Sequence, residues 1–174
     1  MNGIRQAGLG RSVRWAWLVL LAALFSGGVW AQAAPGGLQG DVAGQKAVHD
    51  FVLTEGFLHK VEALSAEADR MKVRPSIDAS KVRSLADMAH ELEATPSAKQ
   101  LLDRNGLTAH EYLAGTFALA GAAMTVAMQE DPQMARYVDA SRVNPANLKF
   151  YQQHRAEIDK LLHLDQPPAS SSAP

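Results

Sequence analysis

Beyond residue 45, apolar residues recur three and four positions apart, which is the spacing of helices with a buried face. One stretch differs from this pattern, because it contains no charged residue between Tyr112 and Met128. A helix that is apolar around its whole circumference needs cover on every side. Thr108 and Glu111 have the spacing of a capping box, in which each side chain accepts a hydrogen bond from the other residue's backbone N–H. The pattern therefore predicts a central helix that begins after Thr108.

Two amphipathic helices are predicted before this central helix. The first runs from Lys46 to about Met71 and ends before Arg74-Pro75, since the residue before a proline is pushed out of the helical region. Its apolar stripe consists of Leu53, Phe57, Val61, Leu64, Ala68 and Met71. The second begins at a capping residue, Asp78 or Ser80, and runs to Ala94.

Three further helix starts combine a capping residue with a following proline. Thr95-Pro96 begins a short helix, Asp131-Pro132 begins a brief one through Val138, and Asn144-Pro145 begins a last helix that reaches His163. The chain shows no alternation of apolar and polar residues long enough for a strand. We therefore predict an all-α fold, a small antiparallel helical bundle of four longer and two short helices around the central apolar helix.

Close packing within this bundle is favoured by small residues on the central helix. Ala114, Ala118 and Ala122 form a ridge at a spacing of four, and glycines lie beside it. Such a ridge allows the backbone of a neighbouring helix to approach closely. The same pattern occurs in membrane helices, but the uncharged stretch is shorter than a bilayer requires. We therefore predict a buried core helix, and no stable membrane insertion of the mature chain.

The first 31 residues have the features of a Sec signal peptide. A segment with three arginines precedes an apolar run of eleven residues, Trp15 to Phe25. Cleavage after Ala31 or after Ala33 satisfies the preference for small residues, and both sites remain open. The alternative is an uncleaved anchor, which needs about twenty apolar residues. We predict export, with a periplasmic or secreted mature protein.

The mature chain is expected to contain one domain. Residues 32–44 are rich in Ala, Gly, Pro and Gln and predict a flexible leader. Residues 45–164 form the single helical bundle domain, and residues 165–174 form a disordered tail. A mature chain of roughly 140 residues has the usual size of a single domain.

Composition and charge exclude several classes of function. The chain has no cysteine, which excludes disulfides, thiolate metal sites and covalent c-type haem attachment. Three of its 17 basic residues lie in the predicted signal peptide, so the mature chain has 14 basic and 18 acidic residues. This balance provides no basic surface for nucleic acid. No G-x-S-x-G, glycine-rich phosphate loop or H-E-x-x-H motif is present, so we predict no catalytic residues and no enzyme.

Two clusters have the spacing of metal ligands along a helix: Glu55, His59 and Glu62, and Asp87, His90 and Glu91. On a helical wheel both clusters point away from the apolar stripes of their helices. Such positions are typical of a solvated helix face. We therefore predict no metal ligands and no cofactor.

His154 is the one histidine that the wheel places within an apolar arc, on the last predicted helix. In a structural interpretation, it is a buried neutral imidazole bonded to a backbone carbonyl or a tyrosine. In a functional interpretation, His154, Tyr151 and Arg155 form the polar end of an internal pocket for an anionic or haem-like ligand. These three residues are the predicted ligand-binding residues.

Two classes of function remain. The first is an exported, non-enzymatic helical binding or interaction protein of the cell envelope, with an unknown protein or small molecule as its partner. The alternative is a carrier of a small ligand, haem or metal that uses the interior of the bundle. The first rests on export, small size and the absence of catalytic motifs.

Overall fold

The computed structural model describes residues 40–73, 77–78 and 80–162, and this part of the chain is all-helical, as predicted. Its elements are α1 (Val42–Asp50), α2 (Glu55–Met71), α3 (Leu85–Ala94), α4 (Pro96–Arg104), α5 (Ala109–Glu130), the 3-10 turns η4 (Ala135–Tyr137) and η5 (Ala140–Arg142), α6 (Pro145–Gln153) and α7 (Arg155–Leu161). The predicted signal peptide, most of the predicted leader and the predicted tail lie outside the described residues.

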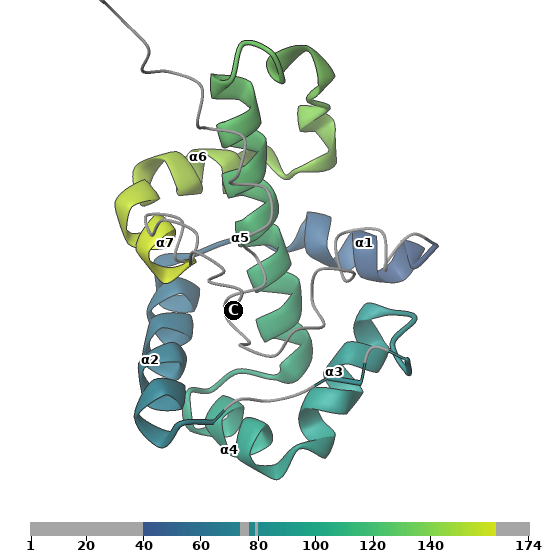
Figure 1. Cartoon of the computed structure of the whole chain (residues 1–174), viewed down its shortest axis with the longest axis vertical. Coiled ribbons are helices and arrows are strands. Elements are labelled where there is room, and N and C mark those ends of the chain that lie inside the picture. Colours follow the sequence, from purple (N-terminus) through teal and green to yellow (C-terminus); the bar gives the residue numbers. More distant parts are fainter. Residues whose placement is uncertain (1–39, 74–76, 79, 163–174) are drawn as a thin grey trace, which may run out of the picture.

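Helix α5 runs along the long axis of the molecule, with α2, α6 and α7 drawn on one side of it and α1 and α3 on the other (Figure 1). Its start is the predicted capping box. The Thr108 hydroxyl accepts from the Glu111 N–H at 3.1 Å, and the Glu111 carboxylate accepts from the Thr108 N–H at 3.0 Å. The Thr108 N–H and the Thr108 hydroxyl both donate to the Glu111 carboxylate, and these bonds to its charged form lower the pKa of Glu111.

The buried surface of α5 contains the predicted ridge of Ala114, Ala118 and Ala122, each exposed by 4% or less. Phe57 of α2 lies so close to Gly115 that an added Cβ would be 2.2 Å from its Cζ atom. By length and composition α5 passes as a membrane-spanning helix, but 61% of its most apolar window is buried by the rest of the fold. This burial is typical of a core helix.

The prediction of one long helix over Lys46–Met71 is wrong, because the chain is extended between α1 and α2. Asn147 of α6 causes this break: its Oδ1 accepts from the Leu53 N–H at 2.9 Å, and its Nδ2 donates to the Phe51 carbonyl at 2.7 Å. Both backbone groups are therefore bonded to a side chain instead of a helical turn. The chain re-enters a helix at Thr54, whose hydroxyl accepts from the Phe57 N–H.

Two helix starts differ from their predicted positions. Helix α1 begins at Val42, within the stretch predicted as a flexible leader, because Asp41 caps it by accepting from the Gly44 N–H. The same carboxylate accepts from the Leu85 N–H at 2.7 Å, which connects α1 to the start of α3. The cap of α3 is Ser84 instead of Asp78 or Ser80. Asp78 instead closes a local turn by accepting from the Ser80 N–H.

The last predicted helix is also interrupted. His154 ends α6 and precedes α7, with backbone angles of φ −111° and ψ 21° that are not helical. The residues after His154 therefore belong to a separate helix, α7, and do not continue the face of α6. Within the brief helix predicted from Asp131-Pro132 through Val138 the chain forms the 3-10 turn η4, and the second turn, η5, follows it.

Replacing Thr108 by alanine is expected to lower the free energy of unfolding by about 1 kcal/mol, the usual cost of a lost N-cap. The loss for Glu111→Ala should not simply add to it in the double variant, because both residues belong to one capping box. Urea denaturation measures these values. Thr95→Ala is the matched control, since Thr95 caps α4 without a side-chain cap hydrogen bond. Equal losses at Thr95 and Thr108 would contradict the importance of the capping box.

Candidate metal centre

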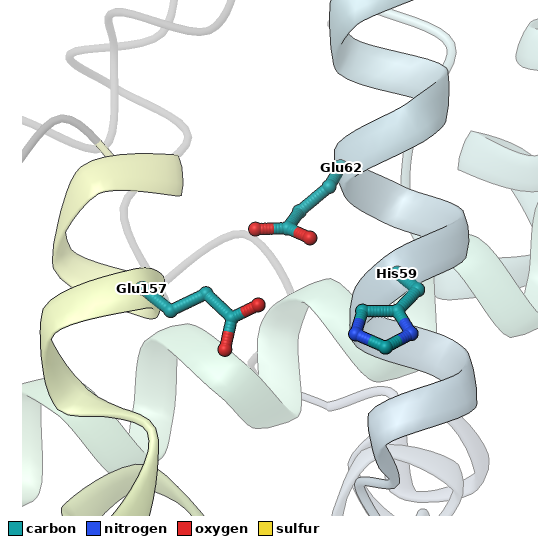
Figure 2. A group of neighbouring side chains, drawn as sticks. All are labelled: His59, Glu62 and Glu157. Carbon is teal, nitrogen blue, oxygen red and sulfur yellow. The ribbon is translucent and has the colours of Figure 1, made fainter.

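The outer face of α2 meets α7 through a group of histidine and glutamate side chains. His59 and Glu62 project from α2 and Glu157 projects from α7 toward them (Figure 2). One potential ligand atom of each residue lies within 4.8 Å of the other two. Glu62 and Glu157 are half-buried and His59 is exposed. These three residues constitute the candidate metal centre.

The positions of these residues follow from the local structure of their helices. His59 and Glu62 are three residues apart on α2, and such residues lie on the same helix face. Glu157 lies in the first turn of α7, next to Ile158, which is fully buried at 0% exposure. Burial of Ile158 fixes α7 against the fold, and Glu157 then lies over the face of α2 that carries His59 and Glu62.

Two carboxylates that face each other repel unless a proton or a cation lies between them. The pKa of Glu62 is raised, first by burial and then by the negative charge of Glu157. A hydrogen bond between the two carboxyl groups acts in the same direction. A bound cation relieves the same repulsion without a proton. The arrangement is therefore suited to a positive ion, and the imidazole of His59 adds a nitrogen donor.

His154 adjoins this centre instead of lying within the core. Its Nδ1 is 3.3 Å from Oε2 of Glu157, and its Nε2 is 3.8 Å from Oε1 of Glu55. Its side chain is 23% exposed and stacks on the Phe150 ring with centroids 4.4 Å apart. The wheel placed the ring in the core because it assumed a continuous helix, whereas the helix ends at His154.

The other two predicted ligand-binding residues make contacts within the fold. Tyr151 is 2% exposed, and its hydroxyl donates to Asp159 at 2.7 Å. Burial and this hydrogen bond raise the pKa of Tyr151. The Arg155 guanidinium donates to both carboxylate oxygens of Glu130, at 2.6 and 2.9 Å. These bonds join α7 to the end of α5, and the ligand-binding role of the two residues stays a prediction.

A shallow hollow of about 290 Å³ lies on a neighbouring face of α2. Its lining consists of Phe51, Thr54, Gly56, Phe57, Lys60, Leu107 and Glu111. The three polar side chains of its lining are bonded within the fold, since Lys60 donates to the Gly106 carbonyl, Glu111 caps α5 and Thr54 caps α2. None of the three predicted ligand-binding residues lines this hollow.

In the second cluster noted in the sequence, Asp87 and Glu91 contact other residues of the fold. The Asp87 carboxylate accepts from the Arg83 N–H at 2.9 Å, which lowers the pKa of Asp87. Glu91 lies 3.8 Å from the ammonium group of Lys81. Asp87 and Glu91 are half-buried, and the interpretation of this cluster as a solvated face stays a prediction.

Glu157 is the member of the candidate metal centre that the sequence interpretation did not include. The available signal was its spacing of three from His154, within a segment considered only for its apolar arc. The chain matches no protein-family model, and neither a curated protein nor a solved structure is found to be similar to it. The function is therefore argued from the site.

Proposed function

We propose that the mature chain is an exported, non-enzymatic helical protein that binds a divalent transition-metal ion between α2 and α7. The observation that carries this proposal is the convergence of one imidazole and two carboxylates, with ligand atoms within 4.8 Å of one another. Zinc lies about 2.0–2.2 Å from such ligands. Small side-chain rotations bring the three donor atoms to the spacing required around one ion.

The donor set favours a particular class of metal. An imidazole nitrogen suits zinc, copper, nickel and iron, whereas magnesium and calcium prefer sites made of oxygen alone. Three protein ligands also leave a coordination position for water or for a ligand from another molecule. Because His59 is exposed, this open position is accessible from solvent.

The rest of the proposal follows the predictions from the sequence. Export to the periplasm or beyond is supported by the signal-peptide features of residues 1–31. An antiparallel bundle around α5 is supported by the contacts of α5 with α1, α3, α4, α6 and α7. The predicted interaction role is compatible with a metal site at the surface, since a protein partner can exchange the ion there.

The test is calorimetric titration of Zn²⁺ into the chain from residue 32 onward, purified without a histidine tag. We expect one bound ion per chain, and at least roughly tenfold weaker binding for His59→Ala and for Glu157→Gln, since ligands must be present and deprotonated to bind. His90→Ala is the matched control, because His90 is an exposed helical histidine outside the centre. Undetectable binding by the unsubstituted chain, or equal losses in the His59 and His90 variants, would overturn the proposal.

A further inference from the structure

The His154 imidazole contacts the candidate metal centre without belonging to its three ligands. Its Nδ1 lies 3.3 Å from Oε2 of Glu157. In the tautomer with the proton on Nδ1, the ring donates to this oxygen. Glu157 then keeps its other carboxylate oxygen, Oε1, for an ion.

The orientation of the His154 ring is fixed by two contacts. Phe150 stacks on one of its faces at an interplanar angle of 25°. The backbone of His154 is held in the junction between α6 and α7, where its N–H donates to the Phe150 carbonyl. A ring held in this way is a rigid donor for Glu157.

Glu157 needs such a partner, because its side chain is long and the Glu62 carboxylate repels it when both groups are ionised. Carboxylates that bind metals are usually held by further hydrogen bonds, and loss of these bonds weakens metal binding about 10- to 100-fold. The His154 ring, 3.3 Å from one oxygen of Glu157, supplies such a hydrogen bond.

We propose that His154 is a positioning residue of the metal centre, which holds Glu157 by one carboxylate oxygen so that the other faces His59 and Glu62. This inference rests on the proposed function. His154 acts through Glu157 and does not itself bind the ion. It therefore sets the affinity of the centre for the metal without adding to the number of ligands.

Two substitutions separate the hydrogen bond from the packing of the ring. His154→Phe keeps an aromatic ring against Phe150 but removes the donor. His154→Asn keeps an N–H donor close to the position of Nδ1 but removes the stacked ring. We expect Zn²⁺ affinity about 10- to 100-fold weaker in the phenylalanine variant, and within about threefold of the unsubstituted chain in the asparagine variant. The melting temperatures of the metal-free proteins should show the reverse order.

The outcomes distinguish this inference from the proposed function. If the unsubstituted chain binds Zn²⁺ and His59→Ala loses binding, while His154→Phe binds as tightly as the unsubstituted chain, His154 has no positioning role and the metal centre stands. If the asparagine variant binds as weakly as the phenylalanine variant, donation to Glu157 is not the cause and the inference is also overturned. If the unsubstituted chain binds no Zn²⁺, the proposed function itself fails.

Discussion

Replacing Asn147 by leucine is expected to lower the free energy of unfolding by about 3 kcal/mol. Asn147 is 1% exposed and bonds the Leu53 N–H and the Phe51 carbonyl in the extended segment between α1 and α2. Leucine has a similar size but no polar atom, so both backbone groups lose their partner. A buried backbone group without a hydrogen bond costs about 1–3 kcal/mol, and two such groups account for the expected loss.

Urea denaturation measures the effect, with Asn144→Ala as the control. Asn144 is also an asparagine at the start of α6. Its side-chain oxygen caps the helix by accepting from the Ala146 N–H, and its side-chain nitrogen makes an exposed hydrogen bond to the His49 carbonyl. Its replacement should cost about 1 kcal/mol, as for other N-caps. If the two variants lose the same stability, the bonds of Asn147 do not hold the break between α1 and α2.

This break explains why part of the fold was not predictable from the sequence. The apolar stripe of the predicted first helix continues across residues 51–54, so local periodicity favours one uninterrupted helix. The group that interrupts it is 94 residues away from Leu53 in the sequence. A hydrogen bond of this kind leaves no local signal. By contrast, the capping box of α5 and its alanine ridge depend on neighbouring residues, and both were predicted correctly.

The candidate metal centre was not predicted for the same reason, because it joins residues that are far apart in the sequence. His59 and Glu62 were noted as possible metal ligands but interpreted as a solvated face, because a helical wheel describes only its own helix. The structure places Glu157 of α7 against that face (Figure 2). The end of α6 at His154 makes this placement possible, and the sequence interpretation assumed that the helix continues. The site therefore depends on a contact between α2 and α7, which cannot be inferred from the residue pattern of either helix alone.

Replacing Gly115 by alanine is expected to lower the free energy of unfolding by up to about 2 kcal/mol. The added Cβ would lie 2.2–2.7 Å from three atoms of the Phe57 ring, which is shorter than any van der Waals contact. Phe57 is 7% exposed and packs edge-on against Phe51, so moving its ring away from the new methyl group disturbs this contact. Overpacking costs about 1–3 kcal/mol, and alanine's better helix propensity offsets about 1 kcal/mol of it.

Gly121→Ala, in the same helix, provides the matched control with the opposite sign. The nearest atom to a Cβ at Gly121 is 3.9 Å away, an ordinary contact, so only the gain of helix propensity remains. This variant should be about 0.5–1 kcal/mol more stable than the unsubstituted chain. Denaturation of both variants under the same conditions separates the effect of the Phe57 contact from the effect of helix propensity.

A double-mutant cycle tests the cause of the loss at Gly115. Phe57→Leu shortens the side chain that faces the added methyl group, so Gly115→Ala should cost less in this background than in the unsubstituted chain. Residues in contact give coupling energies of about 0.5–3 kcal/mol, whereas separate sites add. If the two effects simply add, the Phe57 ring does not contact residue 115 this closely. The same conclusion follows if Gly115→Ala is stabilised like Gly121→Ala. Phe57 lies in α2 two residues before His59, so its contact with Gly115 also helps to position the α2 side of the candidate metal centre.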